Sequence, residues 1–284
     1  MRRYVSPLSI CLVLVLIPSL GQATQLCEYD GVPATAPASQ FTDNGDGTVT
    51  DTVTSLQWKR CSEGQTWDGT TCTGTASNYT WQQALQAADA ATYAGQSDWR
   101  LPNVKELVSI VERACVSPAI DLSVFPGIPE GSFHWSSSPV TFTTGYFWGV
   151  YFRLGEVNYL PGSFAYVATS VRLVRAGSDS GPLNDTGISS WADDSNFTLS
   201  AEPIDYPGQD ASFGRDVSQD NDLDGHAGFS FRKVGGDGSL LSTSASSWNC
   251  VYDEVTGLTW EVKTNDSGLR DKDWTYSWYN SDPA

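Results

Sequence analysis

Apolar residues recur at helical spacing in the stretch SDWRLPNVKELVSIVERAC, which begins at Ser97. Pro102 disfavours helix at the residue before it, and Asn103 followed three residues later by Glu106 has the form of a capping box. A helix is therefore predicted to start near Val104. Its apolar face is formed by Val104, Leu107, Val108, Val111 and Cys115, and the charged side chains of Lys105, Glu106, Glu112 and Arg113 are expected mostly toward water.

A second short helix is predicted in TWQQALQAADA, where Thr80 and Gln83 form another capping box. Trp81, Leu85 and Ala88 make its apolar stripe. The stretches FHWSSSPV, GYFWGVYFRLGEVNYL and FAYVATSVRLVRAG instead carry aromatic and β-branched residues with partial alternation, which predicts strands. The pattern favours an α+β fold with two early helices, an antiparallel sheet that closes late, and an N-terminal hairpin whose Trp58 packs near that sheet.

Turn signals and an internal repeat divide the chain further. In FTDNGDGTVTD we interpret Asp43 and Asp46 as turn-forming residues of a hairpin. VTDTVTSLQWKR, from Val49, and VYDEVTGLTWEV, from Val251, align without gaps and place Trp58 opposite Trp260. A first unit from residue 41 to residue 175 does not fit into the residues after 249, so the second copy is expected to be truncated. The expected divisions are 1–23, 24–176, a connecting segment 177–247 rich in Gly, Asp and Ser, and a partial repeat 248–284.

Composition limits the class of partner. The chain has 284 residues, 40% of them hydrophobic, which is enough for one or two domains with a sizeable core. Twenty-six glycines and a single methionine favour short strands and loops over a helical bundle. The formal charge of −17 repels phosphate backbones, so we expect no nucleic-acid partner.

The N-terminus has the pattern of a secretory signal peptide. Arg2 and Arg3 precede the apolar run LSICLVLVLIPSL, and GQA ends at Ala23 as a small-residue cleavage site. The run is shorter than the roughly 20 residues that span a bilayer, so we expect no transmembrane anchor. A secreted, periplasmic or cell-surface location follows.

Export favours disulfides among the remaining cysteines. Cys61 and Cys72 bracket the polar loop SEGQTWDGTT, which can fold back on itself, and Cys27 and Cys115 then form the second pair. A reactive thiol or zinc site is the alternative, but there is no CxxC motif and the chain has two histidines. Cys250 is left without a predicted partner.

An acidic stretch of the connecting segment raises the question of calcium. Asp220, Asp222 and Asp224 stand at alternate positions before Gly225, a spacing that can collect oxygen ligands. Phe231 occupies the position where an EF-hand has a bidentate Glu. The stretch is therefore either a solvated acidic loop or a weak calcium site, and no cofactor is required.

Several motifs in one order resemble a known family. FTDNGDGTVTDTVTSLQWKRC, TWQQAL, DWRLPNVKELVSIV, HWSSSP, WGVYF and VRLVR resemble the bacterial DUF1566 family, also called the Lcl C-terminal domain family. WNCVYDEVTGLTWEVKT is similar to the start of another copy. The resemblance implies a C-type-lectin-like fold related to the formylglycine-generating enzyme, in which Trp99 and Leu101 pack inside and Arg100 is held by a carboxylate or by carbonyl oxygens.

Fold alone does not decide function, so the site residues must. A formylglycine-generating enzyme would need a late pair of cysteines, and VRLVRAGSDSG has none. Ser136, Ser137 and Ser138 stand beside His134, but no G-x-S-x-G motif or second histidine in the first unit supports a triad. We therefore expect no enzymatic activity.

Two classes of function remain. One is an exported binding or adhesion module that contacts an extracellular glycan or an envelope protein; the other is a structural repeat of a larger envelope protein with no ligand of its own. The resemblance implies binding to sulfated glycosaminoglycans, which the acidic charge disfavours. The candidate sugar-stacking residues are Trp148, Tyr151, Tyr159 and Tyr166, although aromatic residues in strands are also typical of a core.

Overall fold

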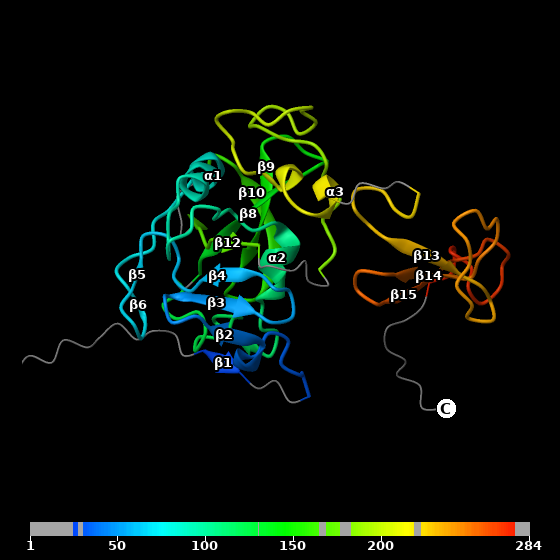
Figure 1. Ribbon diagram of the computed structural model, residues 1–284, viewed down its shortest axis with the longest axis horizontal. Coiled ribbons are helices and arrows are strands. Elements are labelled where there is room, and N and C mark those ends of the chain that lie inside the picture. Colours follow the sequence, from blue (N-terminus) through cyan, green and yellow to red (C-terminus); the bar gives the residue numbers. More distant parts are fainter. Residues whose placement is uncertain are drawn as a thin grey trace, which may run out of the picture.

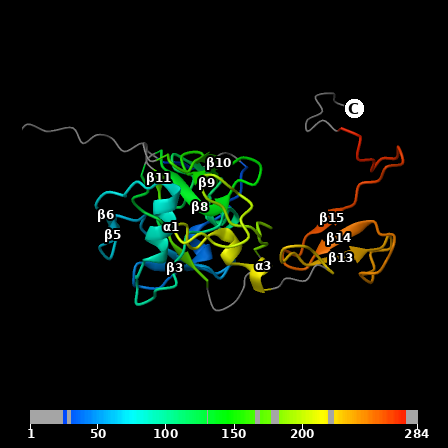
Figure 2. The same cartoon turned by 90° about the horizontal axis from the view of Figure 1, so that it is seen from above.

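Short strands and a few short helices make up the protein. The computed structural model describes residues 25–27, 31–129, 131–164, 169–176, 183–218 and 223–275. The blue-to-green body in Figure 1 holds the first unit, and a three-stranded sheet lies to one side of it in both views (Figures 1 and 2). The predicted α+β class is confirmed.

The helices and strands are short. The helices are η1 (Ala38–Gln40), α1 (Trp81–Asp89), α2 (Val104–Ser109), η2 (Asp210–Ser212) and α3 (Arg215–Ser218). The strands are β1 (Leu26–Cys27), β2 (Phe41–Asp43), β3 (Thr48–Asp51), β4 (Gln57–Lys59), β5 (Thr66–Trp67), β6 (Cys72–Thr73), β7 (Cys115–Val116), β8 (Phe133–Pro139), β9 (Tyr146–Tyr151), β10 (Glu156–Pro161), β11 (Thr169–Ser170), β12 (Val174–Arg175), β13 (Phe231–Val234), β14 (Cys250–Asp253) and β15 (Thr259–Glu261).

Two four-stranded sheets form the first unit. Their strand orders are β10-β9-β8-β11 and β12-β4-β3-β2, and every pair is antiparallel except β11 with β8. The late strand β12 returns to the early hairpin, where Val174 lies opposite Trp58. This pairing confirms that the hairpin packs beside the end of the first unit. Asp43 accepts a hydrogen bond from the Gly45 amide at 2.9 Å, as predicted for a turn-forming residue.

Two clusters of buried side chains form the core. One joins β3 and β4 to α2 and includes Trp58, Leu107 and Phe125. The other lies under α1, where the Trp81 ring stacks on Phe147 with their centroids 3.5 Å apart. Since these aromatic residues are almost fully buried, they account for the large core that the composition predicts.

Both predicted capping boxes are present. At α1 the Thr80 side chain accepts from the Gln83 amide, and at α2 the Asn103 side chain accepts from the Glu106 amide, with the reciprocal bond in each case. The second helix is shorter than predicted and ends at Ser109. Val111 and Cys115, which belong to the predicted apolar face, therefore lie beyond the end of α2.

The expectation that Glu106 and Glu112 face water is wrong. The exposed fraction of the surface is 7% for Glu106 and 3% for Glu112. Arg100 donates two hydrogen bonds to Glu106, at 2.7 and 2.6 Å, which confirms the predicted carboxylate partner of this arginine. Glu112 accepts from the backbone amides of Thr35 and Ala36 at 3.1 and 3.0 Å. Buried carboxylates with such partners are stable inside a fold, so hydrophobic spacing alone misplaces them.

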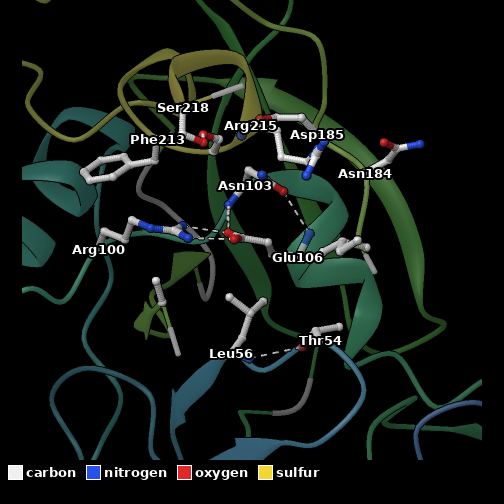
Figure 3. A pocket seen from close by; sticks show the side chains of 13 residues that line it. Thr54, Leu56, Arg100, Asn103, Glu106, Asn184, Asp185, Phe213, Arg215 and Ser218 are labelled. Carbon is white, nitrogen blue, oxygen red and sulfur yellow. Dashed lines mark hydrogen bonds and ion pairs between the residues drawn. The ribbon is translucent and has the colours of Figure 1, made fainter. Parts of the chain in front are cut away.

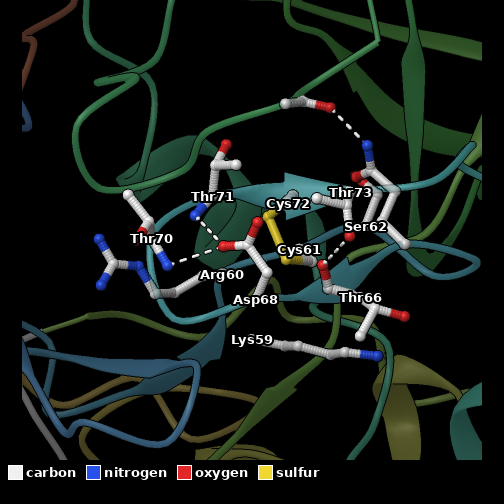
Figure 4. The surroundings of a disulfide bond; sticks show 12 residues. Lys59, Arg60, Cys61, Ser62, Thr66, Asp68, Thr70, Thr71, Cys72 and Thr73 are labelled. Atoms are coloured by element: carbon white, nitrogen blue, oxygen red, sulfur yellow. Dashed lines mark hydrogen bonds between the residues drawn. A yellow bond between two sulfur atoms is a disulfide. The ribbon is translucent and has the colours of Figure 1, made fainter.

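Both predicted disulfides are present, Cys27–Cys115 and Cys61–Cys72. The Cys61–Cys72 disulfide closes a loop that is held by hydrogen bonds of its own (Figure 4). In this loop Asp68 accepts from the amides of Thr70 and Thr71 at 2.9 and 2.8 Å. Within the described ranges Cys250 is the one cysteine outside a disulfide.

The three-stranded sheet β13-β14-β15 repeats the geometry of β2-β3-β4. Trp260 pairs with Val251 as Trp58 pairs with Val49. In the first hairpin Asp51 accepts hydrogen bonds from the Val53 amide at 2.9 Å and from the Thr54 hydroxyl at 2.7 Å, two and three residues further along the chain. Asp253 makes the same two bonds at 3.0 and 2.8 Å. The aligned sequences thus form the same turn.

Over the described part of the chain, none of the helices is both long enough and apolar enough to cross a membrane. The predicted signal segment, residues 1–23, lies outside the described residues.

Candidate functional site

Four aromatic side chains gather on the β9–β10 hairpin, and we call them the aromatic cluster. Trp148 and Tyr159 are cross-strand partners whose ring centroids lie 5.1 Å apart at an interplanar angle of 84°. The Tyr146 ring contacts Tyr159 at 5.8 Å, and Phe142, from the turn before β9, contacts Trp148 at 6.1 Å and Tyr159 at 5.8 Å. Phe142 is 65% exposed and Tyr159 37%.

Strand alternation places this cluster at the surface. Successive side chains of a strand point to opposite faces, so Tyr146 and Trp148 share one face while Phe147, between them, is buried against Trp81. The perpendicular rings stabilise one another through edge-to-face contacts and leave part of their surface open to solvent. The arrangement is therefore a rigid, partly exposed aromatic surface rather than core.

The four candidate stacking residues of the sequence do not all meet here. Trp148 and Tyr159 are brought together, whereas Tyr151 packs against the core cluster that contains Trp135. Tyr166 lies outside the described residues. Tyr146 was missed, although its spacing of two from Trp148 was a usable signal, and the turn residue Phe142 carried no local signal.

His134 and Ser137 lie inside the protein. The His134 ring is fully buried, 3.2 Å from the Ser62 hydroxyl through Nε2 and 3.3 Å from the Ser132 hydroxyl through Nδ1. Burial, and next the charge of Arg172, hold the pKa of His134 well below its ordinary value. Ser137 is 1% exposed, so a substrate in solvent does not reach this pair.

A cavity of about 330 Å³ lies where the segment after the first unit crosses α2 (Figure 3). Its charged lining includes the Arg100–Glu106 ion pair, with the Phe213 ring 5.2 Å from the guanidinium carbon of Arg100. Arg215 also lines it and donates through Nε to the Gly228 carbonyl at 2.9 Å. The Arg100 and Glu106 charges are therefore paired with each other in the wall of the cavity.

Buried carboxylates fasten the same segment to the first unit. Asp210 accepts from the hydroxyls of Ser138 and Thr186 at 2.5 and 2.9 Å, and burial raises its pKa to about 7. Burial also raises the pKa of Asp216 to about 7, with the neighbouring Asp185 adding to the effect. No local sequence pattern predicts this contact, since Ser138 and Asp210 are 72 positions apart.

The calcium prediction falls mostly on residues that are not described. Asp220 and Asp222 lie outside the described ranges. Asp224 accepts from the Ser230 hydroxyl at 3.3 Å, and its carbonyl accepts from the Phe231 amide at 2.8 Å. Among the described residues there is no group of three or more His, Cys, Asp or Glu side chains that could hold a metal ion. Calcium binding stays a prediction.

Comparison with known proteins identifies the first unit. Residues 47–175 match the family model of the Lcl C-terminal domain, as the motifs predict. The match ends at residue 175, so the second copy stays a prediction. No curated protein and no solved structure matches the chain. The family suggests a module associated with the bacterial envelope. Residues 47–175 of this chain are therefore similar to the Lcl C-terminal domain family.

Proposed function

We propose that this chain is an exported, non-catalytic binding module of the bacterial envelope, and that the aromatic cluster contacts a glycan or an envelope protein. The observation that carries the proposal is the contact of four aromatic rings at the β9–β10 hairpin and its preceding turn, where Phe142 and Tyr159 are exposed and Tyr146 and Trp148 are half-buried. An exposed apolar patch of this kind is typical of an interaction site. Tyr and Trp suit it because each combines a large apolar ring with a polar group.

The acidic charge selects among ligands. A formal charge of −17 opposes binding of sulfated polymers, which need clustered Arg and Lys. Neutral sugar rings stacking on Trp148 and Tyr159 avoid this repulsion. The cluster thus favours uncharged glycans over the sulfated glycosaminoglycans that the family resemblance implies.

The non-catalytic part of the proposal has its own support. His134 and Ser137, the residues that would suggest a hydrolase, are buried, and the His134 ring bonds to Ser62 and Ser132 within the core. Turnover of any defined substrate that is lost on replacing His134 with Gln would contradict this part.

A glycan array probed with the purified chain, followed by calorimetry on each hit, tests the binding. Trp148→Ala and Tyr159→Ala should each weaken affinity by about tenfold or more, as expected for anchor residues. Trp274→Ala is the matched control, because Trp274 is 56% exposed and lies outside the cluster. If no glycan or envelope extract is bound, or if the three variants bind alike, the chain is the structural repeat of the alternative hypothesis.

A further inference from the structure

An apolar groove of about 520 Å³ runs along the sheet β13-β14-β15. The side chains of Phe231, Val251, Leu258 and Trp260 line it, and Lys105 of α2 stands at its border with the first unit. Leu258 and Trp260 are 52% and 56% exposed. The groove is distinct from the aromatic cluster.

The groove occupies the place that the core occupies in the first unit. Hairpin register makes Phe231 equivalent to Phe41, since each lies opposite the aspartate of its turn. By the same register Trp260 is equivalent to Trp58. In the first unit these positions are covered: Trp58 is fully buried, and the Phe41 ring meets Phe125 edge-on at 5.3 Å. Among the described residues, the second sheet presents the corresponding apolar side chains, but Leu258 and Trp260 remain more than half exposed.

The first unit also shows what covers such a sheet. Strand β12 pairs antiparallel with β4, and Val174 lies opposite Trp58. The Lys59 amide donates to the Leu173 carbonyl across this junction, at 3.0 Å. Glu261 holds the position of Lys59 on β15, and β15 is the outer strand of its sheet (Figure 1). Within the described part of the chain no further strand pairs with the outer edge of β15, so this edge can take one more strand.

We propose that the edge of β15 and the adjoining groove bind an extended polypeptide strand of the β12 type, with a branched apolar residue opposite Trp260. The strand would add to the sheet antiparallel, with backbone hydrogen bonds supplying affinity and the apolar side chain supplying selectivity. The occupant is the closing strand of an Lcl-type domain, because the equivalent sheet in the same chain is closed by such a strand.

Charge agrees with this choice of occupant. Strand β12 and its flanks read VRLVR, with an arginine next to each apolar residue. Arg175 pairs with Asp98 at 2.7 Å in the first unit. A strand with this basic character is attracted to a chain of strongly negative net charge, whereas a second copy of the acidic chain is repelled.

The test adds an acetylated, amidated peptide with the sequence of residues 169–176, TSVRLVRA, to the isotope-labelled full chain and follows the amide spectrum. The Glu261 amide and the Trp260 indole N–H should shift saturably. Trp260→Ala in the chain, and Val174→Asp in the peptide, should each weaken binding by about tenfold or more. Trp274→Ala, equally exposed at 56%, should leave binding unchanged.

Three results would overturn the proposal. One is the lack of a saturable shift up to about 1 mM peptide, the weak end of specific recognition. Another is a shift that lies away from β15 or persists in the Trp260→Ala chain. The third is a dimer in light scattering that dissociates on Trp260→Ala, since a second copy would then occupy the groove. Retained dispersion of the β13 and β14 amides in Trp260→Ala shows that the second sheet is still folded in the variant.

Discussion

Replacing Asp210 with Asn should remove much of the pH dependence of stability of this protein. The Asp210 carboxyl is 2% exposed, and burial raises its pKa from 3.8 to about 7. Burial is the main cause because it penalises the charged form; the charges of Asp185 and Glu106 act in the same direction, while the bonds from Ser138 and Thr186 act against it.

The sign of the effect follows from proton linkage. The folded state keeps a proton that the unfolded state has lost, so the stabilisation is complete below about pH 4 and is lost as the pH rises through 7. Of the range from pH 5 to pH 8, about two pH units lie below the folded pKa of Asp210. Over those two units the chain loses about 2.7 kcal/mol of unfolding free energy. Asn has no such proton to lose.

Urea titrations at pH 5 and pH 8 measure the difference. The unmodified chain should lose about 2.7 kcal/mol more than Asp210→Asn between the two pH values. Asp205→Asn, at an exposed carboxylate of the same segment, is the control and should behave as the unmodified chain. If Asp210→Asn and the unmodified chain lose the same free energy, the Asp210 carboxyl is ionised in the fold and the reasoning fails.

The two repeats and the sulfur chemistry give further predictions. Trp58→Ala should lower the unfolding free energy by about 3–5 kcal/mol, because Trp58 is buried, and Trp260→Ala should lower it by less than about 0.5 kcal/mol, because Trp260 is 56% exposed. Equal losses in denaturant titration would contradict this difference between the two repeats. Serine at both Cys27 and Cys115, which are 88 positions apart, should cost about 4–5 kcal/mol from loop-closure entropy, with a loss under 1 kcal/mol arguing against it. Calorimetry should find calcium binding with a dissociation constant of about 10⁻⁴–10⁻³ M, and Asp224→Ala should weaken it. If no heat of binding is seen at millimolar calcium, the stretch is only a solvated acidic loop.

The features that the sequence predicts correctly are those decided within a few residues. The capping boxes at Thr80 and Asn103 and the turn at Asp43 depend on side chains that reach nearby backbone, and Cys61 meets Cys72 only 11 positions further on. Spacing in the chain is therefore enough to find them.

Features decided by distant partners escape this kind of reasoning. Glu112 lies inside because Thr35 and Ala36, far back in the chain, present their amides to it. Asp210 is buried because Ser138 meets it from β8. In the aromatic cluster, the alternation of β9 predicts which side chains share a face, but only the β9–β10 register decides that Trp148 meets Tyr159.

The return of β12 to β4 has a consequence for how the chain folds. The hairpin β3–β4 is built from neighbouring residues and its aspartate turn, so it can form on the microsecond scale. Val174 must come back to Trp58 from the far end of the domain, a non-local contact that forms late. Until then β4 is an unpaired edge with a tryptophan at its centre, open to association with another chain. Lys59 and Arg60, the two residues after this tryptophan, are positive charges of the kind that disfavours such association at a strand edge.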